Sequence, residues 1–147
     1  MVRIVRAQPA DLPDVASLFD AYRCFYGQPS DRDGAKAFLA ERMARQQSVI
    51  LLARGGDQAL GFTQLYPSFS SVSMAPIVIL NDLFVVPEGR GQGIATALLD
   101  AACCHARAAG AIRLSLSTAV DNHAAQALYE GAGWKRDTAF TEYSFSL

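Results

Sequence analysis

Three closely spaced glycines lie between an apolar segment and an amphipathic one. The apolar run Val78–Val86 ends at Pro87, residues 94–101 carry apolar side chains at helical spacing, and between them lie Gly89, Gly91 and Gly93. A strand, a glycine loop and a helix N-terminus in this order expose backbone N–H groups to a phosphate, and the helix dipole favours negative charge there. Glycine permits the positive φ and the close backbone approach of such a loop. The sequence therefore predicts a nucleotide-cofactor site, with Arg90 as a nearby positive charge.

The spacing within this loop does not fit two common nucleotide-binding motifs. A dinucleotide fingerprint needs a small residue at its sixth position, where this chain has Ile94 or Thr96, depending on the starting glycine. A P-loop needs Gly-Lys-Ser/Thr, and the loop has no lysine. The pattern that remains is Arg-x-x-Gly-x-Ala at Arg90–Ala95. A plain structural turn stays open as the alternative.

A second motif follows further along the chain. Residues Asn122–Trp134 read NHAAQALYEGAGW. Asn122 and Tyr129 are about two helical turns apart, which places them on one face of a short helix. Together the two motifs resemble the two signatures of the GNAT superfamily of N-acetyltransferases, with Trp134 where the family usually has Phe. The resemblance extends over the whole chain and is strongest to small-amine acetyltransferases of the diamine type.

This resemblance implies acetyl-CoA as the cosubstrate. In the family, the pantetheine arm hydrogen-bonds to exposed backbone of a central strand, which is a form of strand addition. The structural alternatives are a buried strand for Leu83–Val85, a solvated surface charge for Arg90 and an ordinary helix N-cap for Asn122. The implied cofactor-binding residues are Leu83, Phe84, Val85, Arg90, Gly91, Gln92, Gly93, Ile94, Ala95, Thr96 and Asn122.

Acetyl transfer to an amine requires two proton transfers. A primary alkyl amine has a pKa near 10.4, so its deprotonation at pH 7 costs about 4.6 kcal/mol and needs a base or a water relay. The resemblance makes Tyr129 the candidate general acid for the leaving thiolate; a core tyrosine is the alternative. Many diamine-type relatives carry a glutamate at the place of Asn81. The side-chain amide of Asn81 cannot accept the proton. Asp82 is the candidate base, although strand alternation turns it to the opposite face unless a bulge intervenes.

Aromatic and polar side chains elsewhere suit a cationic amine. Each of them is equally compatible with ordinary packing or a solvated loop. The candidate substrate-binding residues are Tyr22, Tyr26, Asp31, Gln64, Tyr66 and Asn81.

The pattern of elements predicts a single α/β domain over residues 1–147. A strand–helix–strand unit over 77–117 requires a right-handed crossover and hence a parallel pair. The expected fold is one mixed, mostly antiparallel sheet with a splayed central parallel strand pair and flanking helices, the acyl-CoA N-acyltransferase fold. Expected strands are 2–6, 48–53, 59–66, 77–86, 112–117 and a closing hairpin of 134–136 with 140–145; expected helices are 11–26, one near 30–43, 91–109 and 122–132; residues 67–76 are expected to form a polar loop.

Composition favours a compact cytoplasmic domain. A net charge of −1 gives no basic surface for nucleic acid, and no apolar run approaches the roughly 20 residues of a membrane span. Three cysteines and two histidines show neither a disulfide framework nor metal-ligand spacing, so no metal is expected. A homodimer is expected only because the resembled enzymes commonly form one.

Three function classes remain open at this stage. The first is acetylation of a small-molecule amine, and the second is acetylation of a protein lysine or N-terminus. The third is a non-catalytic acyl-CoA-binding module, which Asn81 keeps open. An unrelated fold with a fortuitous glycine turn is the least specific reading, and the second motif argues against it.

Overall fold

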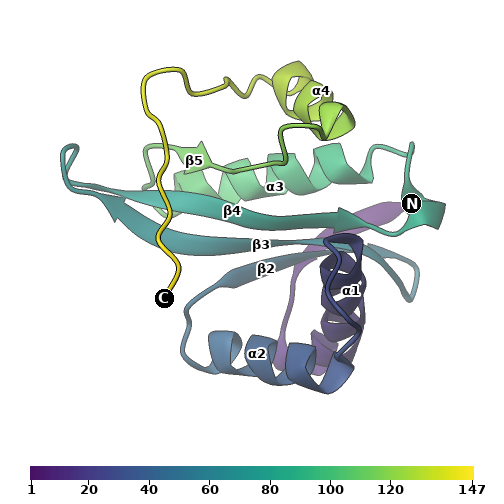
Figure 1. Cartoon of the computed structure of the whole chain (residues 1–147). Coiled ribbons are helices and arrows are strands. Elements are labelled where there is room, and N and C mark those ends of the chain that lie inside the picture. The colour runs from purple at the N-terminus through teal and green to yellow at the C-terminus, as the bar shows by residue number, and fades with distance from the viewer. The chain divides into compact units, whose positions relative to one another are not determined.

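A computed structural model describes residues 1–147, and the chain forms two compact parts, Met1–Leu116 and Ser117–Leu147 (Figure 1). The expectation of a single domain over 1–147 therefore stays a prediction. No helix is both long and apolar enough to cross a membrane. The elements are β1 (Val2–Arg6), η1 (Pro9–Asp11), α1 (Leu12–Phe25), α2 (Arg32–Ala44), β2 (Val49–Gly55), β3 (Gln58–Ser70), β4 (Ala75–Val85), η2 (Pro87–Gly89), α3 (Ile94–Ala108) and β5 (Leu114–Ser115) in the first part, and α4 (His123–Gly131) in the second.

The first part is built on one mixed sheet in the order β1-β2-β3-β4-β5. All neighbours are antiparallel except β4 and β5, which are parallel. This confirms the expected α/β class and its parallel strand pair. Figure 1 shows α1 and α2 on one face of the sheet and α3 on the other.

Both faces of the sheet are covered by apolar helix stripes. On one face Val15 and Leu18 of α1 and Leu39 of α2 form a buried cluster with Phe62 and Phe84 of the sheet. On the other, α3 buries one stripe at helical spacing, because its apolar residues recur every three to four positions. The buried residues of α3 are Ile94, Leu98, Leu99, Ala102 and Ala106.

A β-bulge interrupts the pairing of β3 with β4. Gln64 pairs with Asp82, whereas Leu65 pairs with Leu80, so Asn81 is the extra residue on β4. A bulge shifts the alternation of side chains by one residue. The Asp82 side chain therefore lies on the α1/α2 face beside Gln64. A bulge is the condition under which the sequence allows Asp82 to act as the base.

The prediction of a polar loop over 67–76 is wrong. Strands β3 and β4 continue their pairing down to Ser70 and Ala75, so the connection is only residues 71–74. Pro67 is accommodated because β2 ends its pairing with β3 at Val49–Leu65, which leaves the rest of β3 as an edge. Proline is tolerated on edge strands because a missing N–H costs no ladder bond there.

The closing hairpin expected over 134–136 and 140–145 is also absent. Residues 132–147 contain no strand, and the amides of Ala139 and Phe140 donate to Asp137 Oδ1 instead. A short segment with strand-forming residues becomes a strand only where a partner strand exists, and an isolated hairpin is marginal in water. For the same reason the strand expected over 112–117 is reduced to Leu114–Ser115, which alone pairs with β4.

Candidate functional site

Two glycines determine the backbone path between β4 and α3. Gly91 has φ +75° and Gly93 φ +78°, in the left-handed region that favours glycine. A Cβ at either position would meet no atom within 4 Å, so backbone conformation rather than space requires glycine here. Because Gly93 takes this conformation as the N-cap, α3 begins at Ile94 and not at Gly91 as the sequence predicted.

The N-terminus of α3 is left without a protein acceptor. The Ala97 amide is the first of α3 to find a backbone acceptor, the Gly93 carbonyl, so the amides of Ile94, Ala95 and Thr96 have none. The Gly93 cap has no side chain to bind them. The amides of residues 91–93 also donate to no protein oxygen. The first turn of α3 contains no acidic residue, whereas those of α1 and α2 each contain one. Six consecutive amides are thus available to an anion.

Side chains of the loop bind its own backbone. Arg90 Nε donates to the carbonyl of Val85 at 3.0 Å, and its guanidinium lies 5.8 Å from the ring centre of Phe84. Gln92 Nε2 donates to the carbonyl of Glu88 at 3.0 Å. Arg90 forms no ion pair with any carboxylate, so no protein anion compensates its positive charge beside the free amides. The arginine that the sequence left open is therefore held against the end of β4.

The last residues of β4 have a strand on one side only. On the β3 side, Leu83, Phe84 and Val85 pair with Thr63, Phe62 and Gly61. On the other side, β5 pairs only with Val78 and Ile79. Within the sheet, the backbone of residues 83–85 therefore has an unpaired edge immediately before the glycine loop. This is the splayed arrangement expected of the parallel pair.

A buried polar cluster lies at the bulge. Asp82 is 2% exposed, and its carboxylate accepts from Gln64 Nε2 at 2.6 Å and Asn81 Nδ2 at 2.8 Å. Burial raises the pKa of Asp82, and the two hydrogen bonds oppose that rise. Thr63 Oγ1 donates to the backbone carbonyl of Asp82 at 2.7 Å. Sequence reasoning missed Thr63, because only the strand register reveals it.

Aromatic side chains of α1 adjoin this cluster. The Tyr22 hydroxyl donates to the backbone carbonyl of Asn81 at 3.2 Å, and the Tyr22 ring packs edge-on against Phe62 and Phe84. Tyr26 lies next to Tyr22, with ring centres 5.0 Å apart, and is half exposed. The structure thus brings four predicted substrate residues together around the bulge, namely Tyr22, Tyr26, Gln64 and Asn81.

Two further predicted substrate residues stand apart from this arrangement in role. Asp31 is the N-cap of α2, where its Oδ1 accepts from Gly34 N at 2.9 Å. This supports the structural alternative for Asp31. Tyr66 is half-buried, and burial, followed by the charge of Asp82, raises its pKa. Its hydroxyl is therefore protonated at neutral pH.

The second part of the chain carries the other motif. Asn122 is the N-cap of α4, since its Oδ1 accepts from Ala125 N at 3.2 Å. Tyr129 is half-buried, and its ring centre lies 6.1 Å from that of Trp134. The Trp134 amide donates to the Tyr129 carbonyl at 3.0 Å. The expected helix is confirmed, and the capping alternative for Asn122 holds.

Comparison with known proteins identifies the family. The model described as "Acetyltransferase (GNAT) family" matches residues 15–134. The chain belongs to this family. It is 47% identical over 146 residues to the uncharacterized N-acetyltransferase YhfO of Bacillus subtilis (strain 168), covering 99% of this chain and 98% of that one. This GNAT chain thus aligns with that relative over almost its whole length.

Two other relatives extend the comparison. A solved structure of a probable acetyltransferase superposes with a TM-score of 0.93 at 44% identity, covering 99% of this chain and 97% of that one. An aminoglycoside N(6')-acetyltransferase type 1 of Klebsiella aerogenes is 30% identical over 99 residues, which is 66% of this chain and 65% of that protein. The family, the fold and an acetyltransferase activity are therefore established together.

Proposed function

We propose that this GNAT acetyltransferase transfers an acetyl group from acetyl-CoA to the primary amine of a small molecule. The observation that carries the proposal is the row of six free amides at residues 91–96, which follow Arg90 and include the first turn of α3. A diphosphate satisfies such donors, and the dipole of α3 adds a favourable field. The pantetheine amides pair with the open backbone edge of residues 83–85, as an added strand does.

The residues at the bulge account for removal of the amine proton. Asp82 is too buried to touch the substrate directly. Asn81 is exposed, and its side-chain amide donates to the Asp82 carboxylate. A water oriented by Asn81 carries the proton from the ammonium to Asp82. The raised pKa of Asp82 makes it a stronger base than an ordinary carboxylate.

The transfer itself is a direct displacement at the thioester. The neutral amine nitrogen attacks the carbonyl carbon, the C–S bond breaks, and the thiolate takes a proton from the hydroxyl of Tyr129. The acylated nitrogen then releases its remaining extra proton, which returns to the Tyr129 oxygen and restores the hydroxyl. In this proposal Tyr129 is the general acid, while Asn122 hydrogen-bonds to the cofactor in addition to capping α4. The products are the acetylated amine and free CoA.

A small-molecule acceptor is favoured over a protein. Tyr22 and Tyr26 offer aromatic faces beside Gln64 and Asn81, and such faces attract an alkylammonium group. The aminoglycoside acetyltransferase relative acts, by its name, on a small amine. Acetylation of a protein lysine or N-terminus and acyl-CoA binding without catalysis are the alternatives. We also propose that the protein is a cytoplasmic homodimer. Light scattering on the purified chain tests whether it is a dimer.

A thiol-release assay tests the proposed function. Purified protein and acetyl-CoA are incubated with diamines, polyamines, aminoglycosides and lysine peptides, and free CoA is measured. We expect release with at least one small amine and none above background with peptides. The Tyr129→Phe variant should lose turnover by about 10²-fold or more while keeping its CoA affinity. If no amine accelerates release and CoA gives no thermal stabilisation, the proposal fails.

A further inference from the structure

A cavity lies at the end of the sheet remote from the glycine loop. Its volume is about 690 Å³, within the range of small-molecule sites. It is lined by the first residues of β2 and β4, the later residues of β3 and the last turns of α2 and α3. The glycine loop instead follows the last residue of β4 and precedes the first of α3. The cavity therefore belongs to the first compact part and is separate from the acetyl-CoA loop.

The cavity wall is mostly apolar and contains no acidic side chain. Among its lining residues, Ile50, Leu65 and Val78 are buried hydrophobic residues, and Met43 and Leu12 add apolar surface. No aspartate or glutamate lines it, although the chain has 14 acidic residues. An aliphatic or aromatic group gains free energy by entering such a space, at about 25 cal/mol per Å² of apolar surface removed from water.

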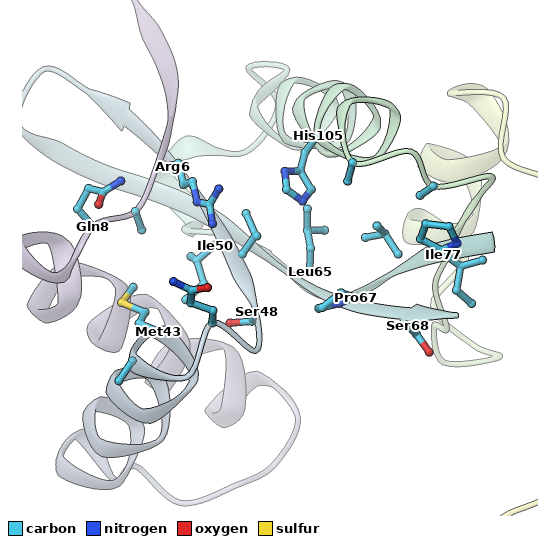
Figure 2. A pocket seen from close by; sticks show the side chains of 18 of the residues that line it. Arg6, Gln8, Met43, Ser48, Ile50, Leu65, Pro67, Ser68, Ile77 and His105 are labelled. Atoms are coloured by element: carbon cyan, nitrogen blue, oxygen red, sulfur yellow. The ribbon is translucent and has the colours of Figure 1, made fainter. Parts of the chain in front are cut away.

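One arginine at this cavity has no counter-ion. Arg6 at the end of β1 lines the cavity and forms no ion pair, whereas Arg54 of the adjacent strand is bound by both Asp11 and Asp14. Figure 2 shows the side chains of Arg6, His105 and Leu65 directed into the same space. Burial, and then the charge of Arg6, lowers the pKa of His105, so that its ring is neutral at pH 7. Arg6 is thus the cationic group of the cavity.

A second polar group of the wall also lacks a partner. Ser48, which is 8% exposed, lines the cavity before β2, and its Oγ is buried without a hydrogen-bond partner. The Ser48 Oγ is inaccessible to solvent, so the charged group of the wall that a ligand can reach is the exposed Arg6. Carboxylates accept hydrogen bonds from guanidinium groups.

We propose that this cavity binds a small monocarboxylate with an apolar tail. The carboxylate pairs with Arg6, and the tail packs on Ile50, Leu65 and Val78. A cationic amine is disfavoured because Arg6 repels it and no carboxylate is present to offset that repulsion. The site is therefore complementary to a class of ligand opposite in charge to the proposed acetyl acceptor.

Calorimetric titration of the full chain with octanoate tests this proposal. Octanol and octylamine serve as neutral and cationic probes of the same chain length, all below the concentration at which they aggregate. We expect saturable octanoate binding with a Kd at or below about 1 mM, and at least tenfold weaker binding of the other two. Equal binding of octanol would show a purely apolar cavity and overturn the assignment to a carboxylate.

Two variants separate the cavity from other anion sites. Arg6→Gln should weaken octanoate binding by at least about tenfold, since charge-assisted hydrogen bonds are among the stronger ones. Arg3→Gln removes the same charge from β1 outside the cavity and should leave the Kd unchanged. The Kd should also be unchanged by saturating CoA. Competition with CoA, or equal effects of the two variants, would overturn the proposal.

The ring of His105 gives an independent spectroscopic readout. The chain has only two histidines, so a His123→Gln variant leaves a single set of histidine ring signals. Octanoate should shift the His105 signals and raise the pKa of the ring, because a bound anion offsets the charge of Arg6. Octanoate binding without any change at His105 would place the ligand elsewhere and contradict the proposal.

Discussion

At the residue scale, Asp82 links stability to pH. Its pKa is raised in the folded protein, chiefly by burial, so folding favours its protonated form. The stability that this group contributes is present below its unfolded pKa, near 3.8, and is lost as the pH rises through the folded pKa. The loss amounts to about 1.4 kcal/mol for each unit of difference between the two pKa values.

We expect Asp82→Asn to remove this dependence. Gln64 Oε1 is buried without a partner, and rotation of that amide would let it accept from the new side-chain amide. The free energy of unfolding of the variant, relative to the original protein, should therefore rise between pH 4 and pH 7 in urea titrations. Asp100→Asn, which removes an exposed carboxylate on α3, is the control for loss of charge. A difference that stays constant across this range would contradict the assignment.

At the element scale, the glycine loop allows a matched pair of variants. Gly93 and Gly110 flank α3 at φ +78° and +76°, and a Cβ at either would meet no atom within 4 Å. Substitution of either glycine by alanine should therefore lower the free energy of unfolding by a similar amount, roughly 1–2 kcal/mol. Only Gly93→Ala should weaken CoA binding, by about tenfold or more, because it shifts the free amides of residues 94–96.

Thermal unfolding and calorimetric titration with CoA measure both effects. Gly110→Ala reports the strain alone, since Gly110 lies beyond the opposite end of the helix. If both variants bind CoA equally well, the amides at the N-terminus of α3 do not hold the diphosphate. If both lose affinity equally, the effect comes from destabilisation and not from the loop.

The same scale shows how far sequence patterns predict these elements. Helical periodicity identified α1, α2, α3 and α4 nearly to their ends, because the apolar stripe of a helix comes from residues close together in the sequence. The bulge at Asn81 could be named as a condition but not located, since it arises from the register between β3 and β4. The predictions at Pro67 and over residues 140–145 were wrong because what these residues form depends on whether a neighbouring strand exists.

At the scale of the whole molecule, the features argued to bind ligands fall into three groups by how far the sequence predicts them. The loop of residues 91–96 was predictable, because glycines and a helix start are local features. The polar cluster of Gln64, Asn81 and Asp82 was only partly predictable, since strand pairing brings these residues together. The cavity beside Arg6 was not predictable, because elements far apart in the sequence form its wall. Features formed by neighbouring residues can be predicted from the sequence. Sites formed by residues far apart in the sequence can be found only in the folded structure.

The burial pattern predicts unequal local stability across the molecule. Residues Phe62–Leu65 of β3 are at most 1% exposed, whereas α4 has no buried residue. Opening of a segment costs less free energy where fewer apolar side chains leave the interior. In native-state hydrogen exchange, we expect the amides of Phe62–Leu65 to exchange slowest and those of α4 about 10²-fold faster or more. Added CoA should slow exchange at Ile94–Thr96, because in the proposed site the diphosphate accepts from those amides. Protection of α4 equal to that of β3 would contradict this ordering, and unchanged exchange at residues 94–96 would place the cofactor elsewhere.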